Sequence, residues 1–294
     1  MKFTKHMSAF IGLASALLLA ALLSFILGSL EQQRRLEARE VAQGFALRLL
    51  ERFNETLGAV YLLSSSVDKY SGEVSHFDEH AADLARDFPL LRALELAPAG
   101  VIRHIYPMRG NEQALDHDLL ADKSRNHAVH LSISNRKMAI AGPLELRQGG
   151  IGVVARYPLF KVAADGRSQF WGLSIAVIDF PLLLRAASDS ELERLGYKYQ
   201  ICWQATADSP CQLLPGGREG SIDNAVTTKV GIAQTNWHLQ VRPEHGWIKP
   251  IEYAFAFIFW LIGSLIMAWG ANRLIRGQAN AQAASLAGLS SPAT

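Results

Sequence analysis

The chain has 294 residues, of which 49% are hydrophobic and 19% are charged, and its formal net charge is +2. This balance offers no basic surface of the kind used to bind nucleic acid, so we expect no nucleic-acid partner. Two long apolar runs, one near each end of the chain, predict an integral membrane protein instead.

Each apolar run is long enough to cross a membrane as a helix. The runs cover residues 8–30 and 251–271, and a helix of about 20 residues spans the hydrocarbon core. The positive charges at their outer ends are Lys2, Lys5, Arg273 and Arg276. Such flanks place both termini in the cytoplasm and residues 31–250 outside it. We therefore predict an inner (plasma) membrane protein with a periplasmic domain, whose first run is too long for a typical cleaved signal peptide.

The segment 31–70 predicts a long stalk helix that continues from the first span. Apolar side chains recur there every three to five residues: Leu36, Val41, Phe45, Leu49, Phe53, Leu57, Val60, Leu63 and Val67. This stripe fits packing against the helix's own domain, and it equally fits a parallel helix from a second copy. We expect a homodimer, although the stripe alone does not separate the two interpretations.

The central segment predicts short helices around an antiparallel sheet, which is an α+β arrangement of PAS-like type. Helical patterns cover residues 78–86 and 122–134, and strand patterns cover residues 92–96, 101–106, 139–141, 152–157 and 170–178. Turn residues at 98–100 and 165–166 separate neighbouring strands. A Gly-x-Gly-x-x-Ala sequence at 150–155 enters a strand rather than a helix, so we expect no nucleotide and no other cofactor.

The chain contains two cysteines, Cys202 and Cys211, and both fall in the predicted periplasmic part. An oxidising compartment favours a local disulfide between them across a hairpin. His127 and His130 lie three apart on a predicted helix, which is weak evidence for a metal site, and no metal is predicted. The tail at 272–294 is poor in bulky and charged residues and is predicted to be disordered.

A set of short motifs between residues 88 and 172 resembles the CHASE domain, an extracytoplasmic sensory module found in front of histidine kinases and nucleotide cyclases. The motifs are FPLLRALE at 88–95, APAGVIR at 97–103, YP at 106, GNE at 110, DLL at 118, GP at 142 and FWG at 170. The resemblance implies a long helix followed by two PAS-like subdomains. We assign them to residues 71–185, distal to the membrane, and 186–248, proximal to it.

The resemblance also suggests a ligand pocket in the distal subdomain. Asp118 and Ile140 align with positions that contact the adenine edge and line the pocket in plant cytokinin receptors. Asp118 would accept hydrogen bonds and Ile140 would form an apolar wall, although Asp118 also suits a simple helix cap. Arg156 replaces a small hydroxyl residue of the plant proteins, and its guanidinium favours a ligand with a carboxylate or phosphate.

These features predict a membrane receptor that binds a small organic ligand and is not an enzyme, since the sequence carries no catalytic motif. Only a short tail follows Arg276, so we expect the signal to pass to a separate histidine kinase or diguanylate cyclase. Two alternatives remain: a scaffold or inhibitor that pairs with full-length receptors, and a remnant of a longer receptor gene.

Overall fold

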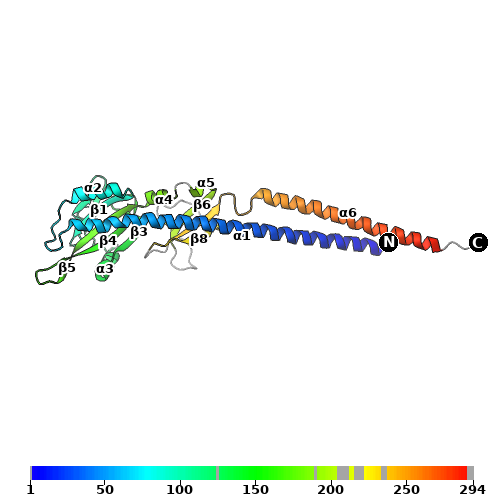
Figure 1. Cartoon of the computed structure of the whole chain (residues 1–294), viewed down its shortest axis with the longest axis horizontal. Helices are drawn as coiled ribbons and strands as arrows, with labels where there is room; N and C mark the ends of the chain where they lie inside the picture. The colour runs from blue at the N-terminus through cyan, green and yellow to red at the C-terminus, as the bar shows by residue number, and fades with distance from the viewer. Residues whose placement is uncertain are drawn as a thin grey trace, which may run out of the picture. The chain divides into compact units, whose positions relative to one another are not determined.

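The computed structural model describes residues 2–123, 126–188, 191–203, 212–214, 222–232 and 237–289. The chain divides into two compact units: one combines residues 1–37 and 245–294, and the other is residues 38–244. Long helices and antiparallel sheets make up these units, which confirms the predicted α+β class. Figure 1 labels the elements along the chain.

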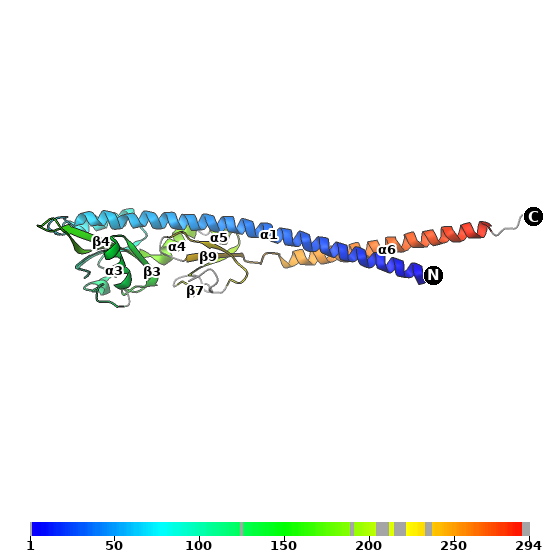
Figure 2. The same cartoon turned by 90° about the horizontal axis from the view of Figure 1, so that it is seen from below.

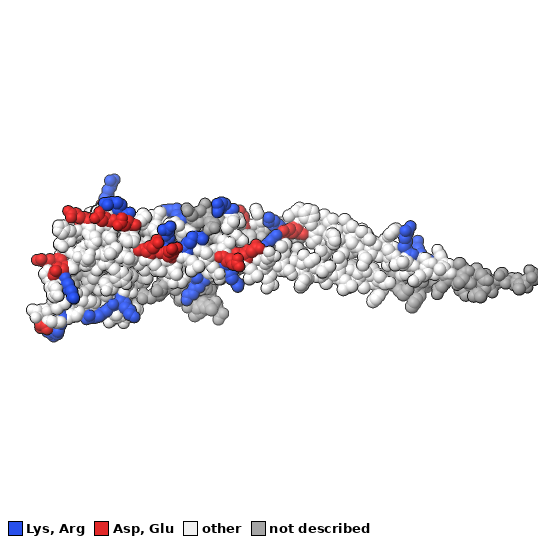
Figure 3. Space-filling view, in the orientation of Figure 1, with Lys and Arg blue, Asp and Glu red and all other residues white. Residues whose placement is uncertain are grey.

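The first unit contains the apolar parts of two helices, α1 (Lys2–Leu63) and α6 (Pro250–Leu289). Both helices are long and apolar enough to cross a membrane, judged by length and composition. They contact each other through Trp260, whose indole N–H donates to the carbonyl of Ala16 at 2.9 Å. Figure 3 shows a long stretch of their visible face without charged side chains.

An ion pair joins α1 and α6 at the end of this apolar stretch. Arg34 donates from its two Nη atoms to the two carboxylate oxygens of Glu252, at 2.7 and 2.6 Å. The same guanidinium donates to the carbonyl of Trp247 at 2.8 Å. The Arg35 guanidinium lies 4.4 Å from the centre of the Trp247 ring. These contacts fix α1 to the start of α6 within the first unit.

Helix α6 continues to Leu289, so the prediction of a disordered tail is wrong for residues 272–289. The segment is rich in alanine, which favours helix, and it contains no proline. Low charge and few bulky residues were therefore compatible with a helix that extends beyond the apolar run.

The second unit begins with an antiparallel sheet of five strands in the order β2-β1-β5-β4-β3. The strands are β1 (Leu91–Pro98), β2 (His104–Tyr106), β3 (Ala139–Glu145), β4 (Ile151–Val162) and β5 (Ser168–Asp179). Each predicted strand corresponds to one of them. Gly149 and Gly150 have positive φ values of 78° and 73° in the turn before β4, so the Gly-x-Gly sequence forms a turn into a strand.

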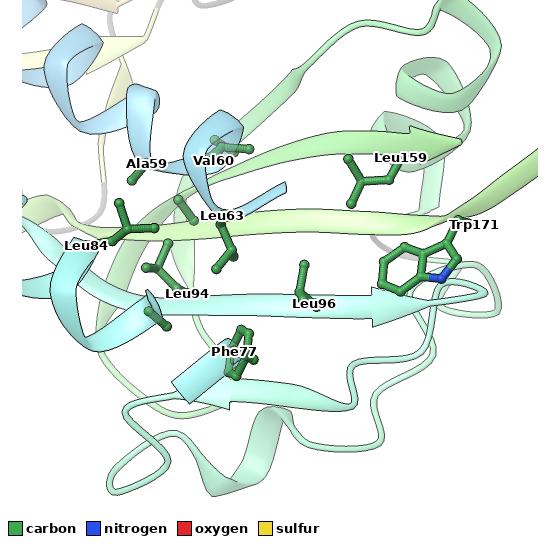
Figure 4. Close-up of a cluster of buried hydrophobic side chains, with 12 residues drawn as sticks. Ala59, Val60, Leu63, Phe77, Leu84, Leu94, Leu96, Leu159 and Trp171 are labelled. Carbon is green, nitrogen blue, oxygen red and sulfur yellow. The ribbon is translucent and has the colours of Figure 1, made fainter. Parts of the chain in front are cut away.

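One face of this sheet is covered by α1 and by α2 (Phe77–Asp87). Figure 4 shows the apolar cluster between them, in which Val60 and Leu63 of α1 lie over Leu94 and Leu96 of β1. Ser174 of β5 donates from its hydroxyl to the carbonyl of Val60 at 2.7 Å. The opposite face is covered by residues 99–123 and by α3 (Asn126–Asn135), which enclose a second apolar cluster.

A second, smaller sheet follows α4 (Phe180–Ser188) and α5 (Glu191–Arg194). It has the strand order β7-β6-β9-β8. Its strands are β6 (Tyr197–Trp203), β7 (Gln212–Leu213), β8 (Val226–Lys229) and β9 (Trp237–Pro243). Phe45 of α1 contacts Tyr199 of β6, with ring centres 5.5 Å apart. Helix α1 therefore packs on both sheets, as Figure 2 shows.

Most of the apolar stripe of the stalk is buried by its own chain, whereas Leu36 at its start is 55% exposed. Phe45, Leu49, Phe53, Val60 and Leu63 are fully buried within the single chain. Of the two interpretations left open by the sequence, packing on its own domain accounts for the stripe. The expected homodimer therefore loses the surface that suggested it, and self-association stays a prediction.

The stalk helix ends at Leu63 rather than at the predicted residue 70. Three serines follow as a short 3-10 helix, η1 (Ser64–Ser66). The hydroxyls of Ser64 and Ser65 donate to carbonyls three residues earlier, at 2.5 and 2.7 Å, and such local bonds compete with helix continuation. Asp68 then accepts the backbone N–H groups of residues 70 and 71, which forms a turn.

Candidate functional site

A cavity lies on the face of the five-stranded sheet that α1 does not cover. Its floor comes from β1, β4 and β5, and its walls come from residues 102–119 and from the turn between β3 and β4. The enclosed space is small, about 30 Å³, and it reaches about 360 Å³ only when the open mouth and the adjoining solvent are counted. The polar side chains that line it are Glu95, His117, Arg147, Gln148 and Arg156.

Strand pairing places Glu95 and Arg156 on the same face of the sheet. Glu95 of β1 pairs with Ile175 of β5, and Arg156 of β4 pairs with the same Ile175 from the other side. Directly paired residues in a sheet project to the same face, so these three side chains form one row across the cavity floor. Glu95 and Arg156 are each only 3% exposed.

Burial governs the acid–base behaviour of Glu95. Loss of hydration raises the pKa of its carboxyl to about 7, and the positive charge of Arg156 lowers it in part. The carboxyl is therefore close to half-protonated at neutral pH. Such a group can accept a hydrogen bond from a cation or donate one to an anion, depending on what enters the cavity.

The cavity wall holds a buried histidine. His117 is 8% exposed, and its Nε2 lies 2.9 Å from the Oδ2 atom of Asp122. The carbonyl of His117 accepts the backbone N–H of Ile102, which ties this wall to the chain after β1. On the other wall, Arg92 donates to the carbonyl of Gln148 at 3.0 Å, which holds the turn between β3 and β4 in place.

The structure does not bring the three residues predicted from the resemblance into one pocket. Arg156 lines the cavity. Ile140 lies on β3 and lines a separate hollow beside α3. Asp118 is exposed, and its Oδ1 accepts the backbone N–H groups of Leu120 and Ala121 at 2.9 and 3.0 Å, as a capping residue does. Ligand contacts by Asp118 and Ile140 stay predictions.

The sequence analysis missed Glu95 as a candidate. The signal was present, because Glu95 is the one charged residue in the apolar run Ala93–Pro98 of a predicted strand. A carboxyl in such a run is rarely buried unless it has a partner or a function. His117 gave no comparable signal, since its burial depends on how residues 102–119 fold over the sheet.

The predicted disulfide falls partly outside the described residues. Cys202 is buried in β6 and is not a free thiol. Cys211 lies outside the described part of the chain. The pairing of Cys202 with Cys211 therefore stays a prediction, which mass spectrometry of the unreduced protein can check.

Comparison with solved structures finds a similar fold in an extracellular ligand binding receptor. An extracellular ligand binding receptor from Desulfohalobium retbaense DSM5692 superposes with a TM-score of 0.53 at 13% identity, over 70% of this chain and 40% of that one. The chain thus spans less than half of that receptor's length. The ligand binding domain of the Pseudomonas aeruginosa PAO1 amino acid chemoreceptor PctC, in complex with GABA, gives a TM-score of 0.49 at 13% identity, covering 71% of this chain and 98% of that one.

No curated protein matches the chain. The scan of protein families, however, matches residues 69–214 to the CHASE domain. This range contains the five-stranded sheet, the cavity and the first strands of the smaller sheet. It also contains the motifs between residues 88 and 172 that suggested the family. Residues 69–214 therefore match the CHASE domain family, as the sequence motifs predicted.

Proposed function

We propose that the protein is a membrane receptor whose extracytoplasmic CHASE domain binds a small organic ligand in the cavity beside Glu95 and Arg156. The observation that carries this proposal is a cavity on the open face of the sheet with a buried guanidinium in its floor. A guanidinium in a water-poor site binds carboxylates and phosphates well because it offers several N–H donors in one plane. The ligand therefore carries at least one acidic group.

The same sheet offers a path from the cavity to the stalk helix. Ile175 and Val177 of β5 line the cavity, while Ser174, between Leu173 and Ile175, donates to the carbonyl of Val60 in α1 on the opposite face. A ligand that favours one position of β5 shifts the equilibrium of α1 by its differential affinity for the two states. The receptor then passes this state to a separate signalling partner, a histidine kinase or a diguanylate cyclase.

A thermal-shift screen of the full-length protein in detergent tests the proposal. Organic acids, amino acids and adenine derivatives are the compounds to screen, because a ligand raises the unfolding temperature by mass action. We expect acidic hits whose effect is lost in Arg156→Gln. The matched control is Arg86→Gln, which changes an exposed arginine on α2 and should keep every hit. Hits that survive in Arg156→Gln would place the ligand elsewhere.

A further inference from the structure

We propose that the ligand is a small zwitterion, such as an amino acid, whose cationic end lies at Glu95 and whose carboxylate lies at Arg156. This inference rests on the proposed function and narrows its ligand class. It starts from the cavity floor, where one acidic and one basic side chain occupy a single row with Ile175 between them.

The spacing of the row suits a short ligand. Neighbouring strands lie about 4.8 Å apart, so the Cα atoms of Glu95 and Arg156 are separated by roughly 10 Å across β5. Both side chains project from the same face and line one cavity. A ligand that lies above Ile175 can therefore reach the carboxyl with one end and the guanidinium with the other. We therefore place a small ligand over this row, with its two charged groups joined by a short carbon chain.

The surroundings of Glu95 alone already suggest that a ligand binds in the cavity. The residue is only 3% exposed. Within the described part of the chain it has no hydrogen bond, and its electrostatic partner is Arg156. A buried carboxyl without a donor costs free energy of folding, because its hydration is lost without replacement. A ligand ammonium in the cavity supplies the missing donor.

A ligand with one kind of charge fits the floor less well. A simple anion at Arg156 would approach the ionised form of Glu95, and a simple cation at Glu95 would approach Arg156. A zwitterion offers an opposite charge to each group. The rest of the lining is mostly apolar, with Ile102, Leu119 and Leu146 among the walls, so it accommodates a short aliphatic part of the ligand.

The binding test uses the full-length protein in detergent and isothermal titration calorimetry. The probes are the L-amino acids, β-alanine and 4-aminobutyrate, each hit being compared with its des-amino carboxylate and its decarboxylated amine. We expect an amino acid to bind at least tenfold more tightly than either analogue. Glu95→Gln should weaken the amino acid at least tenfold while it leaves the des-amino acid unchanged or tighter. Glu55→Gln, an exposed carboxylate on α1, is the control that should change neither.

The pH dependence in the wild-type protein gives an independent readout that does not need a folded variant. Affinity for the amino acid should rise between pH 5.5 and pH 8 because Glu95 ionises near pH 7, whereas affinity for the des-amino acid should fall. The other charged or titratable groups that line the cavity are His117 with its partner Asp122, Arg147 and Arg156. If Glu95 causes these opposite trends, both affinities should stay constant between pH 5.5 and pH 8 in Glu95→Gln.

The outcomes separate this inference from the proposed function. Tight binding of carboxylates through Arg156, with no gain from an amino group and no effect of Glu95→Gln, would overturn the zwitterion and keep the receptor. The zwitterion would also be overturned if the affinities for the amino acid and for its des-amino analogue changed with pH in the same way. Binding of no acidic compound at all would contradict the proposed function itself.

Discussion

Glu95 lies in the floor of the cavity, and the burial of its ionised carboxyl lowers the stability of the folded state. Its pKa is raised from the ordinary value of 4.5 to about 7 by burial, which corresponds to roughly 3 kcal/mol less stability for the folded state once the group is ionised. The folded state binds more protons than the unfolded state between these two values. Stability from this group is therefore complete below pH 4.5 and is lost as the pH rises through about 7.

Glu95→Gln should change how the stability of the ligand-free protein depends on pH. At pH 8 the variant should be more stable than the wild type, by up to roughly 3 kcal/mol, because the amide does not ionise. Near pH 4.5 the two proteins should be similar. Thermal unfolding of the full-length protein in detergent between pH 4.5 and 8 measures the difference. Parallel profiles over this range would show that Glu95 is not the titrating group.

Gly172 makes a second prediction at the scale of single residues, since it closes the FWG motif where β5 passes β1. A Cβ added there would contact the carbonyl of Ala97 and lie 2.8 Å from the Cα of Pro98. Gly172→Ala should therefore push the two strands apart and cost about 1–3 kcal/mol of stability. Gly58→Ala is the matched control, because nothing lies within 4 Å of the added Cβ and alanine favours helix. Equal unfolding temperatures for the two variants would contradict the close approach.

The candidate site was only partly predictable from single residues. Arg156 was chosen because it replaces a small hydroxyl residue of the plant proteins that the chain resembles, and the structure places it in the cavity floor. Glu95 is a charged residue within an apolar strand, but it was considered only as part of a family motif. Asp118 and Ile140 were chosen by alignment, and alignment does not show that one caps a turn while the other lines a different hollow.

At the scale of elements, α1 contributes more to the core than any other helix in the second unit. Its side chains Phe45, Leu49 and Phe53 are fully buried, while Leu47 between them is 65% exposed. Phe53→Ala should cost about 3–5 kcal/mol because it leaves a cavity. Leu47→Ala should change stability by less than about 0.5 kcal/mol. If Leu47→Ala is instead the more harmful variant, the exposed face of α1 is covered in the protein by another chain.

The strands were predictable, whereas the two helix ends were not. Alternating and β-branched runs bounded by glycine and proline located every strand of the larger sheet within a few residues. The end of α1 at Leu63 depends on serine hydroxyls that bond to nearby carbonyls, and periodicity does not register these bonds. The sequence did not decide which surface buries the apolar stripe of the stalk, because a partner helix and the helix's own domain require the same spacing of apolar residues.

At the scale of the whole molecule, the orientation in the membrane is a prediction of the charge pattern. Both termini are expected in the cytoplasm, so a cytoplasmic reporter fused after Gly277 should be active and a periplasmic reporter should not. Fusions after Gly72, which lies in the second unit, should give the opposite result. Activity of a periplasmic reporter after Gly277 would reverse the topology and place the CHASE domain in the cytoplasm.

The alternation of side chains along β5 limits how the ligand preference of the proposed receptor can change over evolution. Ile175 and Val177 face the cavity, and Ser174 and Ala176 face the helical side of the same strand. A substitution that reshapes the floor from β5 therefore also disturbs the backbone on which α1 rests. Residues 102–119 and the turn at 146–148 border the cavity without lying in this strand. Related receptors with different ligands should accordingly differ in these loops and keep β5 almost unchanged.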